Sequence, residues 1–120
     1  MEITIGGKER ELRFGVGFVR KLDDVYRANV KGIEFGAGLV IANMQLAQMN
    51  PATLSDVIQA AVSGKKVTTR QVDVFVDDYA EEHGGLKSLF EEIEEEMGKS
   101  LVVKDTLKQT GEATEELEED

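Results

Sequence analysis

Apolar and polar residues alternate at the start of the chain. Ile3 and Ile5 stand between polar residues, and Leu12 and Phe14 do the same after a Gly-Gly pair at 6–7. An alternation with a period of two places one apolar face on a core and one polar face in water. Adjacent glycines supply the positive φ angles that a tight turn needs. The pattern therefore predicts an antiparallel β-hairpin.

The spacing of apolar residues becomes helical directly after this hairpin. Val19, Leu22 and Tyr26 recur at intervals of three and four residues, which is typical of a helix with one buried face. A two-stranded hairpin alone is only marginally stable in water. We therefore predict that the hairpin packs on this first helix.

The next segment, ANVKGIEFGAG, is rich in glycine. Apolar residues flank Gly32 on both sides, which favours a short additional strand or hairpin. Gly36 and Gly38 then mark a loop or a point where two backbones pack closely.

Four helices are predicted in the remainder of the chain. Leu39–Met49 is apolar on nearly every side and carries no charge. Asn50 can cap a second helix that has proline at its first position, and Thr68 or Thr69 can cap a third. A last helix begins near Leu86, and these three later helices each show an apolar stripe.

Together these elements predict an α+β fold that is mainly helical, with an N-terminal antiparallel β-hairpin packed on a bundle of about four to five helices. A chain of 120 residues can bury a single core. We predict one domain over residues 1–100 and a mobile acidic C-terminal tail over residues 101–120, where the periodicity is weak. The residues expected in the core include Ile5, Leu12, Phe14, Leu22, Phe75, Phe90 and Ile93.

The composition narrows the cellular setting. The chain contains no cysteine, so it has neither a disulfide framework nor thiolate chemistry. No apolar run resembles a signal peptide or approaches the roughly 20 residues of a membrane span. We expect a soluble, cytosolic protein.

Charge is distributed unevenly between the two halves of the chain. Residues 1–71 carry ten Lys/Arg against seven Asp/Glu, a net of +3, and residues 72–120 carry four against seventeen, a net of −13. This asymmetry argues against binding of a nucleic-acid backbone by the second half. It fits either a basic protein partner or simple solubility.

Residues that could carry catalysis or bind a metal are scarce. His83 has no second histidine or cysteine with which to complete a zinc site, so a surface residue at a helix end is favoured. Asp73, Asp77 and Asp78 share one helix, but the apolar run Val74–Val76 interrupts the oxygen ligands of a calcium loop. Two G-x-G patterns lack the third glycine of a dinucleotide site. We expect no enzymatic activity, cofactor or metal.

Two features remain as candidates for function. The first is the uncharged helix 39–49, because methionine adapts to more than one partner surface. This helix is either central in the core or exposed as a binding groove or a self-association patch. The second is the acidic end of the chain, which either binds a partner or only keeps the protein soluble. The predicted partner-binding residues are Leu39, Val40, Met44, Met49, Glu115, Glu116, Glu118 and Glu119.

The opening ITIGGKERELRFGVGFVRKLDD resembles the start of the tail assembly chaperones of long-tailed, siphovirus-type phages, especially those of Gram-positive bacteria. In that family a hairpin I-x-G-K-x-x-x-L-R-F-G leads into a helix G-F-x-R-x-L-D. The matching positions are Ile5, Gly7, Lys8, Leu12, Arg13, Phe14, Gly15, Gly17, Phe18, Arg20, Leu22 and Asp23. A later G-x-x-F-G-x-G-L pattern matches Gly32, Phe35, Gly36, Gly38 and Leu39. The segments VDVFVDDYAEE and LFEEIEEEMGKS are similar to the family's last two helices.

This resemblance implies a role in virion morphogenesis. Such chaperones bind and solubilise the tape-measure protein and help recruit tail-tube subunits, and they are absent from the mature tail. The implied partners are thus the tape-measure and tail-tube proteins of a phage or prophage, with no nucleic acid and no membrane.

A second hypothesis comes from a different class of protein. A small acidic domain can act as a regulator that occupies the basic nucleic-acid-binding surface of a partner, here through residues 72–97. Such binding loses affinity steeply with salt, whereas a chaperone that holds apolar surface does not.

Overall fold

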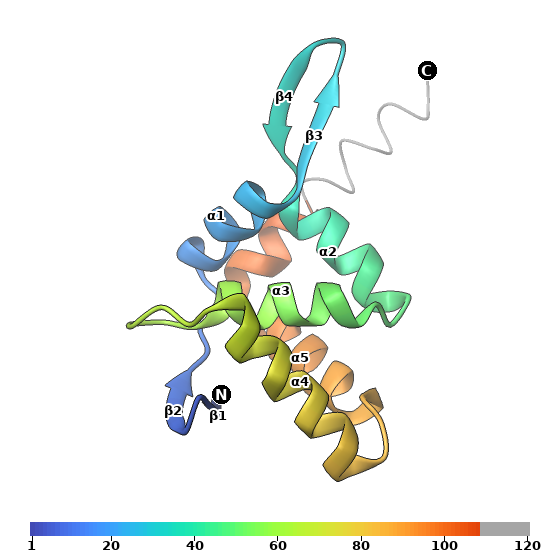
Figure 1. The fold of residues 1–120 in the computed structure, drawn as a ribbon. Helices are drawn as coiled ribbons and strands as arrows, with labels where there is room; N and C mark the ends of the chain where they lie inside the picture. Colours follow the sequence, from blue (N-terminus) through green and yellow to red (C-terminus); the bar gives the residue numbers. More distant parts are fainter. Residues whose placement is uncertain (109–120) are drawn as a thin grey trace.

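The computed structural model describes residues 1–108, with only the backbone described for residues 28–30 and 33–36. Its order is β1 (Glu2–Ile5), β2 (Lys8–Glu11), α1 (Val16–Val25), β3 (Arg27–Val30), β4 (Ile33–Gly36), α2 (Gly38–Ala47), α3 (Pro51–Ala61), α4 (Thr69–His83) and α5 (Lys87–Lys99). A further helical segment occupies residues 101–108. The predicted fold class, mainly helical α+β with an N-terminal antiparallel hairpin, is confirmed (Figure 1).

The first hairpin forms as predicted but packs elsewhere. β1 and β2 pair in antiparallel register, with Ile5 opposite Lys8, and both turn glycines have positive φ. The prediction that the hairpin packs on α1 is wrong, because β1 lies against α4. The cause is a backbone connection to the end of α3. Arg13 N donates to Ala61 O at 2.8 Å, and Ser63 N donates to Glu11 O at 2.9 Å.

The second hairpin, β3–β4, confirms the additional hairpin that the glycine-rich segment favours. Its register places Asn29 opposite Glu34. Figure 1 shows this hairpin projecting from the helical body at the point where α1 ends and α2 begins. It connects those two helices, which pack against each other.

Predicted caps set the starts of two helices. The Asn50 side chain accepts hydrogen bonds from the backbone N–H groups of Ala52 and Thr53, at 3.0 and 3.3 Å. Thr68 and Gln71 form a reciprocal capping box at the start of α4. These contacts satisfy N–H groups that lack a partner within the helix.

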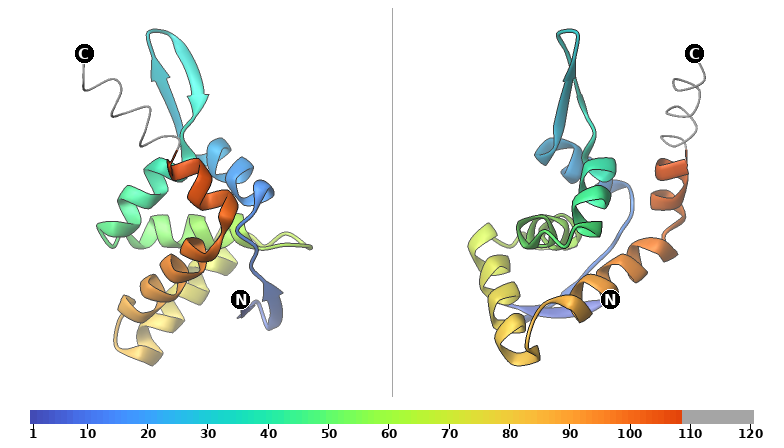
Figure 2. Two further views of the ribbon diagram at one scale, coloured as in Figure 1. Left: turned by 180° about the vertical axis from the view of Figure 1, so that it is seen from behind. Right: turned by 90° about the vertical axis from the view of Figure 1, so that its right-hand side faces the viewer.

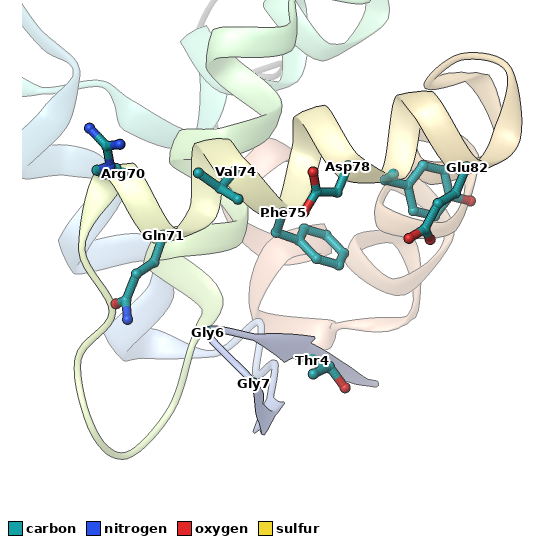
Figure 3. Close-up of a pocket in the computed structure, with 10 residues that line it drawn as sticks. Thr4, Gly6, Gly7, Arg70, Gln71, Val74, Phe75, Asp78 and Glu82 are labelled. Carbon is teal, nitrogen blue, oxygen red and sulfur yellow. The ribbon is translucent and has the colours of Figure 1, made fainter.

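The core lies among α1, α2, α3, α4 and α5. Seven residues are expected in the core from the sequence. Six of them are buried, namely Ile5, Leu12, Phe14, Leu22, Phe90 and Ile93, and Phe75 is the exception. The prediction that Phe75 is buried is wrong, because its side chain is only partly buried at the edge of the core. Its ring lies on the side of α4 that faces the first hairpin (Figure 3).

The segment after residue 100 differs from the predicted tail. Residues 101–108 are helical, and Val103 is only 2% exposed. Ser100 caps this segment, since its Oγ accepts from Val103 N at 3.2 Å and donates to Phe14 O at 2.5 Å. The segment is drawn in red in Figure 2. The remainder of the predicted tail, from residue 109, lies outside the described residues.

Within residues 1–108, every helix falls short of the length and apolar content that crossing a membrane requires.

Candidate partner-binding surface

Helix α2 buries one side and exposes methionine on the other. Leu39, Ala42 and Leu46 are buried, at intervals of three and four residues, and the helix packs on α1 and α3. Met44 lies on the open side and is 59% exposed. An exposed methionine on an uncharged helix is a flexible apolar surface suited to binding protein.

The predicted partner-binding residues from 39 to 49 differ in how far the structure exposes them. Leu39 is 1% exposed and therefore lies in the core, so its role in partner binding stays a prediction. Val40 is half-buried, and Met44 and Met49 are exposed. The predicted surface therefore reduces to the two methionines, with Val40 at its margin. Glu115, Glu116, Glu118 and Glu119 lie outside the described residues.

Met49 adopts a backbone conformation that favours glycine. Its φ is 58°. Met49 N donates to Leu46 O at 2.9 Å, and Asn50 N donates to Gln45 O at 3.1 Å. These two bonds form a Schellman motif at the end of α2, in which the left-handed residue is usually glycine. The left-handed conformation costs a residue with a Cβ about 1–2 kcal/mol. The Met49 side chain is 49% exposed, so burial of this side chain offsets the cost only in part.

We expect Met49→Gly to raise the free energy of unfolding by about 0.5–1 kcal/mol, because relief of the left-handed strain outweighs the extra entropy of glycine in the unfolded chain. Urea denaturation measures this change. Met44→Gly is the matched control, since Met44 lies inside the same helix and the change should cost about 1 kcal/mol. Destabilisation by both variants would contradict the strain at Met49.

Polar side chains hold the buried side of α2 in place. The hydroxyl of Thr53, a residue that is itself buried, donates to Gln45 Oε1. Tyr26 OH donates to Asp56 Oδ2 at 2.7 Å and lies 3.5 Å from Thr53 Oγ1. Burial raises the pKa of Tyr26, and the neighbouring Asp56 carboxylate acts in the same direction. This network joins α2 to α3 and fixes which side of α2 faces outward.

The side chains considered for catalysis or metal binding have structural partners or face water. His83 stacks on the Tyr79 ring with centroids 3.9 Å apart, and its Nδ1 lies 3.0 Å from Tyr79 O. Asp73 accepts a hydrogen bond from the Ser55 hydroxyl, and Asp77 and Asp78 are exposed. Among residues 1–108, no cluster of His, Cys, Asp or Glu is arranged to hold a metal ion.

A groove between the first hairpin and α4 was missed by the sequence reasoning. It has a volume of about 550 Å³ and is bordered by Thr4 and the turn glycines on one side and by α4 on the other (Figure 3). The α4 residues that line it are Arg70, Gln71, Val74, Phe75, Asp78, Tyr79 and Glu82. Their spacing marks one face of α4, but the sequence does not reveal that the hairpin lies beside that face.

The groove and the exposed methionines are both surfaces suited to binding protein. Residues 2–112 match the family described as phage tail assembly chaperone protein, TAC. The chain belongs to this family. No curated protein and no solved structure matches the sequence. Membership of this family gives the chain a role in phage tail assembly and implies protein partners among the tail proteins.

Proposed function

We propose that this chaperone binds and solubilises the tape-measure protein of a siphovirus-type phage or prophage of Gram-positive bacteria, and that it helps recruit tail-tube subunits. It acts in the host bacterial cytoplasm and is absent from the mature tail. Membership of the tail assembly chaperone family supports the general role. The resemblance of the first hairpin and helix to chaperones of long-tailed phages supports the specific partners.

The observation that carries this proposal is the exposed methionine surface of α2. Met44 and Met49 are large apolar side chains left open to water. Met44 lies on α2, which carries no charge from Gly38 to Ala47, and Met49 lies just after the end of this helix. Contact with an apolar helix of the tape-measure protein would remove both side chains from water, which stabilises the complex in proportion to the apolar area covered.

The acidic surface has a separate role in this proposal. Exposed carboxylates line α4 and α5, on the sides that face away from the core. A large net negative charge keeps complexes apart in solution. The chaperone would therefore cover apolar tape-measure surface with α2 while its acidic helices keep the complex dispersed.

Met44→Asp tests the proposal. We expect it to weaken co-purification with a tape-measure fragment by at least tenfold, because the new carboxylate loses its hydration in the complex. The fold should be retained, since Met44 is 59% exposed. Circular dichroism and a thermal melt check folding, and pull-down followed by calorimetry measures binding.

Two control variants separate apolar contact from charge. Val25→Asp adds the same charge at a similarly exposed site on α1 and should leave tape-measure binding unchanged. Glu95→Lys reverses an exposed charge on α5 and should have little effect. Loss of binding with Glu95→Lys but not with Met44→Asp would show that the interaction is electrostatic, and the methionine surface would be the wrong site.

A further inference from the structure

The groove beside the first hairpin combines an apolar centre with acidic residues at one end. Val74 is 46% exposed and Phe75 is partly exposed, and both line the groove. Asp78 and Glu82 follow toward the end of α4. Figure 3 shows Phe75 and Glu82 directed toward the hairpin, whereas Arg70, at the other end, points away from it.

Asp78 and Glu82 have no charged partner among the residues that the structure describes. Neither Asp78 nor Glu82 forms an ion pair or a side-chain hydrogen bond with any residue in the described range 1–108. Val74, Asp78 and Glu82 are spaced four residues apart on α4, so they form a single row along the groove. The row therefore presents an apolar position followed by two negative positions.

The length of the groove suits a short extended segment. The α4 residues that line it span Arg70–Glu82, a length of about 18 Å at the helical rise. An extended chain rises about 3.3 Å per residue, so about five or six residues cover this length.

The spacing of the row also matches an extended chain. Successive members of the row lie about 6 Å apart along α4. In a strand, side chains on one face recur every two residues, about 6.6 Å apart. An extended segment with an apolar residue, then a basic residue two positions later and another two positions after that, would thus place each side chain opposite its complement.

We propose that this groove is a second docking site, distinct from the methionine surface, for an extended protein segment with the pattern apolar–x–basic–x–basic. The apolar side chain rests on Val74 and Phe75, and the two cations pair with Asp78 and Glu82. The turn of the hairpin lies close to α4 at Gly6, where an added Cβ would lie 2.9 Å from Gln71 Nε2.

Peptide binding to the full chain tests this proposal. The probe is a nine-residue fluorescent peptide with leucine at its centre followed by arginine at the second and fourth positions beyond it, in a serine and threonine background. Two matched peptides replace the leucine by serine or the arginines by glutamates. Fluorescence anisotropy gives Kd, and amide chemical shifts show where the peptide lies.

We expect the first peptide to bind with shifts centred on Val74, Phe75 and the turn of the first hairpin, and the two matched peptides to bind at least fivefold more weakly. The double variant Asp78→Asn/Glu82→Gln should raise Kd about five- to tenfold, since each exposed ion pair contributes modestly. The double variant Asp77→Asn/Glu81→Gln is the control. It removes the same charge from the same helix outside the groove and should leave Kd within twofold.

Equal weakening by the two double variants would overturn the proposal, because binding would then follow total charge. Shifts centred on Met44, or no binding by the first peptide at millimolar concentration, would overturn it as well. Met44→Asp should leave peptide binding unchanged while it weakens tape-measure binding. The proposals for the two sites can therefore be refuted independently of each other.

Discussion

Replacing Gly38 by alanine is expected to lower the free energy of unfolding by about 3 kcal/mol, at the upper end of the cost of overpacking. A Cβ at this position would lie 2.1 Å from the carbonyl carbon of Leu22 and 2.2 Å from its oxygen. These are backbone atoms, so no side-chain rotation can relieve the overlap, and α1 and α2 would have to move apart. The same movement would break the hydrogen bond that Gly38 N donates to Asp23 Oδ1 at 3.0 Å.

Urea denaturation with Gly98→Ala as a matched control measures this effect. Gly98 lies in α5, and a Cβ there would meet no atom within 4 Å. This control should stabilise the protein by about 0.5–1 kcal/mol, because alanine is the better helix former. A loss of less than 1 kcal/mol for Gly38→Ala would show that α1 and α2 do not approach as closely as the structure indicates. Because α2 carries Met44, the variant should also weaken tape-measure binding.

The local elements are predictable because their signals lie within a few residues. The Gly-Gly turn, the Asn50 cap and the Thr68 cap each depend on neighbouring positions, and each is present in the structure. The glycine-rich pattern predicts a loop or a close packing point at Gly38. The close approach is correct, but only the structure identifies Leu22 as the residue it meets.

The contacts that the sequence could not predict are those between distant segments. The first hairpin lies beside α4 because residues 11–13 pair with residues 61–63. The sequence of neither segment indicates that it pairs with the other. That placement leaves Phe75 at the margin of the core and creates the groove. The methionine surface was predictable only in part. A helix that is apolar all round does not show which side faces outward, and here contacts with α1 and α3 decide that Leu39 is buried and Met44 exposed.

Phe90→Ala is expected to lower the free energy of unfolding by about 3–5 kcal/mol, the range for deletion of a large aromatic side chain from a core. Phe90 is 3% exposed and belongs to the same core cluster as Leu89, Ile93 and Met97 of α5. Removal of the ring leaves a cavity that the surrounding backbone cannot fill, so packing contacts are lost together with the apolar burial.

Guanidinium denaturation with Glu91→Ala as the control measures the loss. Glu91 is the exposed neighbour on the same helix, and its replacement should change stability by less than about 0.5 kcal/mol. Because α4 and α5 follow each other through a short turn, loosening α5 should also disturb the groove, and the arginine peptide should bind more weakly to Phe90→Ala than to Glu91→Ala. A destabilisation below about 0.5 kcal/mol for Phe90→Ala would place its ring outside the core. The core position of α5, and the support it lends to α4, would then be wrong.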